Sequence, residues 1–213
     1  MLAFVAMLSF SVPSMAEVRS ETVPLDRPVL VVGDSLSSEY GIRRSSGWVQ
    51  LLRDRLAGLY PKPPAVINAS ISGDTTSGGL TRLPALLDEH RPGLVIIELG
   101  GNDALRGLAL EMTRNNLTEM VQMSQKAGAV VVITGIQIPS NYGPAYTKAF
   151  KNLYPDIAKA TGARLVPFLL AGLETDRNLF IEDGIHPAES AQPILLNNVW
   201  PIIEAVLPEP QSK

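Results

Sequence analysis

Five short runs of nearly continuous apolar residues recur along the chain, separated by stretches in which apolar residues return every third or fourth position. Continuous apolar runs of this length are typical of strands in a parallel sheet that is covered on both faces. The runs occupy residues 29–32, 65–68, 94–99, 129–134 and, more weakly, 164–166. The intervening spacing predicts amphipathic helices with one buried face. Their apolar faces fall within residues 48–59, 80–87, 117–124, 146–157 and 194–206.

The alternation of strands and helices predicts right-handed βαβ units and one α/β domain of three layers, with helices on both faces of a parallel five-stranded sheet. No internal repeat or linker divides the chain. In such a sheet, ligands bind beyond the carboxyl ends of the strands. Polar or glycine-rich sequence follows each of the first four runs, and we expect function just after Val32, Asn68, Leu99 and Thr134.

The first of these loops reads Gly-Asp-Ser-Leu at residues 33–36. We expect Ser35 at the N-terminus of a short helix, where free backbone N–H groups and the helix dipole would stabilise a developing oxyanion. The same residues are also typical of an ordinary helix cap formed by Asp34 or Ser35. The motif alone therefore does not distinguish a nucleophile from a cap.

The second and third loops each offer a hydrogen-bond donor. Gly73 has a backbone N–H with no side chain to crowd a ligand. Asn102 follows two glycines and could direct its side-chain amide into the same space. Each also has a simpler interpretation, as a loop glycine and as an Asx turn. We expect the neighbouring Asp103 to order the turn rather than to react.

A histidine near the C-terminus supplies a candidate base. Asp183 lies three residues before His186, so its carboxylate can hold one imidazole nitrogen and leave the other free to act on a serine. The chain has only one other histidine, His90, which is expected to end a helix as a solvated cation. Together, Ser35, Asp183 and His186 supply a nucleophile, an orienting group and a base. Ser35, Gly73 and Asn102 supply three donors for an oxyanion hole.

Composition narrows the possible functions further. The net charge of −3 gives no basic field for binding nucleic acid. The chain has no cysteine, which excludes disulfides and thiolate chemistry, and it has too few candidate ligands for a typical zinc site. We therefore expect neither a metal nor an organic cofactor.

The N-terminal segment differs from the rest of the chain. Residues 2–12 are almost wholly apolar, and Ser14-Met15-Ala16 offers small residues at the expected positions of a cleavage site. This pattern predicts a signal peptide over residues 1–16, a mature domain over 17–213 and a periplasmic or secreted protein. No Lys or Arg precedes the apolar run, and the alternative is a short apolar segment packed on the domain. The run is too short to span a bilayer, so we expect no stable membrane insertion.

Four sequence blocks, taken in order, resemble those of the SGNH (GDSL) hydrolases, a family named after the Ser, Gly, Asn and His that they carry. The blocks are residues 33–36, 72–74, 100–103 and 183–187. Further similarity, at 68–75, 79–87, 98–103 and 139–143, resembles the thioesterase and arylesterase branch of that family. The resemblance covers roughly residues 28–207, and a match in all four blocks is specific. The segment 59–64 looks longer than the family pattern.

The resemblance implies a flavodoxin-like fold without the sharp Gly-x-Ser-x-Gly elbow of α/β-hydrolases. It implies hydrolysis of small acyl esters and thioesters through an acyl-enzyme on Ser35, by a protein that we expect to be a monomer. It also implies that Ile138, Pro139 and Tyr142 border the acyl group. Two alternatives stay open at this point: a carbohydrate deacetylase of the same family, and a non-catalytic binding domain that retains the loops.

Overall fold

The computed structural model describes residues 22–210, so the predicted signal peptide lies outside the described residues. Its centre is a parallel five-stranded sheet with the strand order β2-β1-β3-β4-β5. The strands are β1 Val29–Gly33, β2 Val66–Asn68, β3 Leu94–Glu98, β4 Val130–Thr134 and β5 Arg164–Val166. The predicted α/β class and all five predicted strands are confirmed, with shifts of one residue at some ends.

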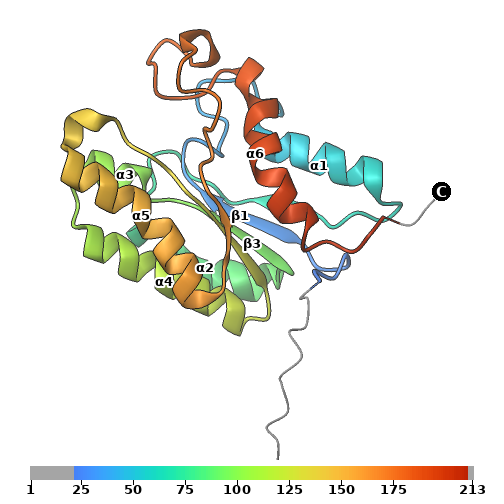
Figure 1. Cartoon of the computed structure of the whole chain (residues 1–213). Helices are drawn as coiled ribbons and strands as arrows, with labels where there is room; N and C mark the ends of the chain where they lie inside the picture. The colour runs from blue at the N-terminus through green and yellow to red at the C-terminus, as the bar shows by residue number, and fades with distance from the viewer. Residues whose placement is uncertain (1–21, 211–213) are drawn as a thin grey trace, which may run out of the picture.

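Helices cover both faces of the sheet and make the three predicted layers. They are α1 Trp48–Leu59, α2 Thr76–His90, α3 Gly101–Leu105, α4 Leu110–Lys126, α5 Pro144–Thr161 and α6 Gln192–Glu204, with 3₁₀ turns at Ser140–Tyr142, Arg177–Leu179 and Glu189–Ala191. Figure 1 shows α1 and α6 together on one face, and α2, α4 and α5 on the other. The short helix α3 is not predicted by periodicity, because five residues are too few to show a repeat.

Successive strand residues alternate between two separate apolar cores, as the period of two in a strand requires. In β1, Val29 and Val31 join the core beneath α1 and α6, whereas Leu30 and Val32 join the core beneath α2, α4 and α5. All four side chains are fully buried. Burial on both faces explains why the strands appear in the sequence as continuous apolar runs.

The parallel arrangement places every loop that follows a strand at one edge of the sheet. His90 lies at the opposite edge, because it ends α2 just before β3 begins. Its side chain is partly buried, with Nε2 3.8 Å from Glu89 Oε1. The two histidines are therefore separated by the length of the strands.

The loops after β4 and β5 are tied together at Gly135. Its N–H donates to the carbonyl of Val166 at 2.7 Å, and its carbonyl accepts from the N–H of Leu169 at 2.9 Å. A Cβ at this position would overlap the carbonyl oxygen of Pro167, which is backbone and cannot rotate away. The close approach of the two loops thus requires glycine here.

We predict that Gly135→Ala lowers the free energy of unfolding by about 1–3 kcal/mol, the usual cost of overpacking. Gly58→Ala is the matched control, because a Cβ at Gly58 would meet no atom within 4 Å on the surface of α1. The control should raise stability by about 0.5–1 kcal/mol through helix propensity. Urea unfolding of both variants checks the prediction, and equal stability of the two would contradict it.

Candidate active site

The fold brings Ser35 to His186 and Asp183, which lie about 150 residues further along the chain. Ser35 follows β1, and its Oγ lies 2.8 Å from Nε2 of His186. The other ring nitrogen, Nδ1, lies 2.6 Å from Oδ2 of Asp183. Both contacts are at hydrogen-bond distance. The three side chains therefore have the arrangement of nucleophile, base and orienting carboxylate that acyl transfer requires.

The loop carrying His186 is folded around the Asp183 carboxylate. Oδ1 of Asp183 accepts the backbone N–H groups of Ile185 at 2.8 Å and His186 at 3.0 Å. Desolvation alone would raise the pKa of Asp183, but these N–H groups and the imidazole outweigh it and lower the pKa to about 2. Asp183 is therefore ionised at neutral pH and can stabilise a protonated imidazole.

An aromatic ring also contacts the histidine. The ring of Tyr40 lies with its centroid 4.5 Å from that of His186, at an interplanar angle of 46°. Tyr40 is 48% exposed, so the two rings together form part of the surface beside Ser35. Sequence reasoning missed Tyr40, because no spacing between residues 40 and 186 predicts the contact.

The structure corrects the expectation that Ser35 begins a helix. In the part of the chain that the structure describes, residues 35–41 form turns and the first helix begins only at Trp48. One helix-like turn does form, in which Ser38 N–H donates to the carbonyl of Asp34 at 3.0 Å. Glu39 then adopts a φ of 62°, which a right-handed helix cannot continue through. Oδ1 of Asp34 accepts the N–H of Leu36 at 3.0 Å, so Asp34 caps this turn.

Of the three predicted oxyanion donors, two keep their backbone N–H groups free. Neither the N–H of Ser35 nor that of Gly73 bonds to another described residue. Gly73 has a φ of +77°, the left-handed region that favours glycine, and its carbonyl accepts from Arg106 Nη2 at 2.8 Å.

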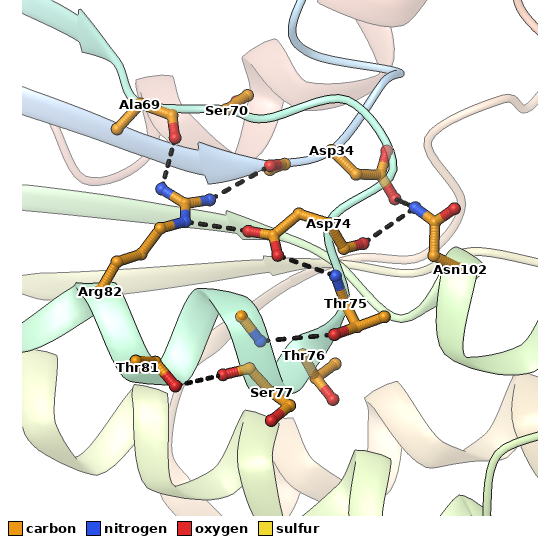
Figure 2. A network of polar contacts seen from close by, with 12 residues as sticks. Asp34, Ala69, Ser70, Asp74, Thr75, Thr76, Ser77, Thr81, Arg82 and Asn102 are labelled. Carbon is orange, nitrogen blue, oxygen red and sulfur yellow. Dashed lines mark hydrogen bonds and ion pairs between the residues drawn. The ribbon is translucent and has the colours of Figure 1, made fainter.

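Asn102 is engaged with the protein. Its Nδ2 donates to Oδ2 of Asp34 and to the backbone carbonyl of Asp74, each at 2.9 Å (Figure 2). An oxyanion would compete with one of these acceptors for an N–H. Asn102 therefore joins the first and second loops as well as lining the pocket.

The neighbouring Asp103 is fully buried and does not line the pocket. Its Oδ2 accepts the N–H of Thr76 at 2.9 Å, and its Oδ1 accepts the hydroxyl of the same residue. Asp103 thus fastens the start of α2 to α3, which agrees with the expected ordering role.

A pocket of about 620 Å³ opens beside Ser35 and His186. It contains all three residues expected to border the acyl group, Ile138, Pro139 and Tyr142. Further apolar side chains that sequence reasoning missed complete its wall: Leu36, Leu105, Ile136, Phe168, Leu170, Phe180 and Ile185. Only the tertiary structure shows that these residues face a common cavity. The lining is mainly apolar, with polar side chains at the serine and at Gln137, Asn141 and Glu174.

Two carboxyl groups lie buried beneath the serine loop. Glu98, the last residue of β3, is fully buried, and Asp34 is 2% exposed. Oε2 of Glu98 accepts the hydroxyl of Ser37 at 2.7 Å and the N–H of Asp34 at 3.3 Å. Its other oxygen, Oε1, has no hydrogen-bond partner among the described residues. Burial raises the pKa of Asp34 to about 6.

The pKa of Glu98 is also raised. Burial is the main cause, and the Asp34 carboxylate adds to it, so the pKa of Glu98 lies well above its ordinary value. The folded protein therefore keeps a proton on Glu98 at pH values where the unfolded chain has lost it. Because the folded state then binds more protons, stability falls as pH rises through this range.

We predict that Glu98→Gln weakens this pH dependence. Above about pH 5, where the unfolded chain has lost this proton and the folded protein keeps it, the slope of the unfolding free energy should become less negative, by up to about 1.4 kcal/mol per pH unit. Glu119→Gln, on the exposed face of α4, is the control and should leave the slope as it is in the parent. Urea unfolding across the pH range measures both. An unchanged slope for Glu98→Gln would mean that Glu98 is already ionised in the folded protein.

Among residues 22–210, no group of three His, Cys, Asp or Glu side chains is placed to hold a metal ion.

Comparisons with known proteins agree with this geometry. Residues 31–192 match the GDSL-like Lipase/Acylhydrolase family. The chain is 51% identical over 179 residues to esterase TesA of Pseudomonas aeruginosa, covering 84% of this chain and 89% of that protein. It is 41% identical over 167 residues to thioesterase 1/protease 1/lysophospholipase L1 of Escherichia coli K12, covering 78% of each.

Solved structures show the same fold. The crystal structure of TesA gives a TM-score of 0.82 at 51% identity, covering 85% of this chain and all of that one. Esterase EstA from Pseudoalteromonas sp. gives 0.79 at 40% identity, covering 84% and 97%. By its sequence, its fold and the four blocks that meet at one edge of its sheet, this chain belongs to the GDSL-like lipase/acylhydrolase family.

Proposed function

We propose that this protein hydrolyses carboxylic esters and acyl thioesters through an acyl-enzyme formed on Ser35. The observation that carries the proposal is the hydrogen-bonded chain from Ser35 Oγ to His186 and on to Asp183, at 2.8 and 2.6 Å, beside an apolar pocket. The names of similar proteins, an esterase, an arylesterase and a thioesterase/lysophospholipase, support the same reaction class.

In the first half of the reaction, Nε2 of His186 takes the proton of Ser35 Oγ as that oxygen attacks the acyl carbonyl. The tetrahedral oxyanion is held by the N–H groups of Ser35 and Gly73, and by Asn102 when it releases one of its two acceptors. His186 then gives its proton to the departing alcohol or thiol. Asp183 keeps the proton of the imidazole on Nδ1 throughout and stabilises the imidazolium.

In the second half, a water molecule replaces the leaving group. His186 takes one of its protons while the resulting hydroxide attacks the acyl-enzyme, and a second tetrahedral oxyanion forms at the same donors. Collapse of this intermediate breaks the bond to Ser35 Oγ, which recovers its proton from His186 as the carboxylic acid departs.

The mainly apolar lining of the pocket supports the acyl hydrolase over the carbohydrate deacetylase. A deacetylase needs a cleft that hydrogen-bonds sugar hydroxyls, whereas Ile138, Phe168 and Phe180 line this one. Apolar walls favour an acyl chain, because its burial releases water from both surfaces. Comparing kcat/KM for long-chain acyl thioesters and acetylated xylooligosaccharides tests the choice, and a preference for the sugar would reverse it.

We also propose that the protein is exported, loses residues 1–16 in the process, and acts as a monomer without nucleic acid. The apolar run at 2–12 and the small residues before Glu17 support export. In the described part of the chain, no helix is both long and apolar enough to cross a membrane. N-terminal sequencing of the protein recovered from the periplasm or medium tests the cleavage site. A protein found only in the cytoplasm would contradict it.

We predict that Ser35→Ala and His186→Ala each lower kcat by a factor on the order of 10⁴ or more. The nucleophile and its base act as one unit, so the loss of either removes most of the rate enhancement that the unit provides. His90→Ala is the matched control, since His90 lies at the opposite edge of the sheet. It should change kcat by less than about two-fold. Hydrolysis of a p-nitrophenyl ester measures the rates, and labelling by a fluorophosphonate probe should be lost only in the first two variants. Labelling of Ser35→Ala would place the nucleophile elsewhere.

A further inference from the structure

An arginine outside the pocket binds two of the three segments that carry the oxyanion donors. Arg82 lies on α2, and its side chain is 19% exposed. Its Nε donates to Oδ2 of Asp74 at 2.9 Å, Nη1 to the carbonyl of Ala69, and Nη2 to the carbonyl of Gly33 at 3.3 Å. Figure 2 shows the guanidinium between the end of the first strand and the second loop.

Each of these acceptors lies next to a part of the proposed oxyanion hole. Gly33 is two residues before Ser35 and ends β1. Ala69 opens the second loop, and Asp74 directly follows Gly73. The Arg82 guanidinium therefore holds the backbone just before Ser35 and the loop that contains Gly73, the two residues whose N–H groups are proposed as oxyanion donors.

The third donor is reached through Asp74. The carboxylate of Asp74 accepts the hydrogen bond from Arg82, and its backbone carbonyl accepts Nδ2 of Asn102 at 2.9 Å. Oδ1 of Asp74 accepts the N–H of Thr75 at 2.9 Å, so the carboxylate cannot turn without losing a second bond. A path of hydrogen bonds thus runs from Arg82 through Asp74 to Asn102.

The chemistry of the guanidinium suits this task. Its donors diverge in a fixed plane, so three acceptors from two segments are held at set angles with little loss of rotamer entropy. The ion pair with Asp74 is shielded, since the two side chains are only 19% and 12% exposed. A lysine would keep the charge but could not reach all three acceptors in one geometry.

On the basis of the proposed function, we propose that Arg82 is a positioning residue that holds the Ser35, Gly73 and Asn102 donors in the geometry that stabilises the oxyanion. Arg82 does not line the pocket, so it acts through the loops and not on the substrate. Its loss should therefore lower kcat and leave KM nearly unchanged. Misplaced donors stabilise the oxyanion of the transition state less well, but they have little effect on the binding of the substrate.

The test compares Arg82→Met and Arg82→Lys with Arg53→Met. Arg53 is a matched control, because it also lies on a helix and donates to a backbone carbonyl near β2, that of Val66 at 2.8 Å. We expect Arg82→Met to lower kcat by about 10- to 100-fold with KM changed less than about two-fold, the scale of a small misplacement of catalytic groups. Arg82→Lys should lie between it and the parent, and Arg53→Met should match the parent.

A double variant separates positioning from simple destabilisation. Asn102→Ala should lower kcat by about 10²–10³-fold, as removal of one oxyanion donor does. If Arg82 acts through these donors, adding Arg82→Met should lower kcat by much less than it does alone. Fully additive losses would overturn the proposal, and so would equal kcat values for Arg82→Met and Arg53→Met.

A readout without turnover keeps the test independent of the proposed function. In ¹⁵N-labelled protein, the amide signal of Gly73 and the side-chain NH₂ signal of Asn102 should shift in Arg82→Lys and stay in place in Arg53→Met. Unmoved signals in Arg82→Lys would overturn the positioning role even in an active enzyme. A parent protein without esterase activity would instead overturn the proposed function, whatever the spectra show. If Arg82→Met does not fold, Arg82→Lys carries both measurements.

Discussion

The carboxylate of Asp34 is the group on which the arrangement of the site depends. One of its oxygens caps the turn that presents Ser35, and the other accepts Nδ2 of Asn102. The nucleophile loop and the third loop are thereby joined through one nearly buried side chain. Such a group is costly to bury, and its hydrogen bonds offset that cost only while both loops keep their places. The loops that follow β1 and β3 are therefore coupled, so a change in the conformation of one should alter the conformation of the other.

The three carboxyl groups near the serine show how environment separates roles. Asp183 lies on an exposed loop among N–H donors, and its pKa of about 2 keeps it charged to serve the imidazole. Asp34 and Glu98 lie below the loop, where burial raises the pKa of each. The charged carboxylate faces the histidine, which would become a cation in the proposed reaction. The buried pair supports the backbone instead, through hydrogen bonds to the turn that follows β1.

The site also combines a rigid end with an apolar one. At the polar end, Arg82 and Asp74 tie backbone carbonyls and carboxylates into one network, so little reorganisation is needed when negative charge develops on the substrate. At the other end, the side chains after β4 and β5 offer a mainly apolar surface. A hydrolase with broad acyl tolerance requires accurately placed donors at the reacting carbonyl and a less specific apolar surface along the acyl chain of the substrate.

The sequence by itself determined the five strands, the three layers and the four blocks, because strand burial and glycine-rich loops leave local patterns of residues. It also singled out Ser35, Asp183 and His186 as candidates, since the chain has few other groups able to act as a base. The tertiary structure decided what depends on strand order and loop packing. It placed Tyr40 against His186, put Phe168 in the wall of a cavity, ended the helix-like turn after Ser35, and brought Arg82 to both the end of β1 and the loop after β2. Contacts between distant segments leave no periodicity in one chain, because they arise only once the sheet sets its strands side by side.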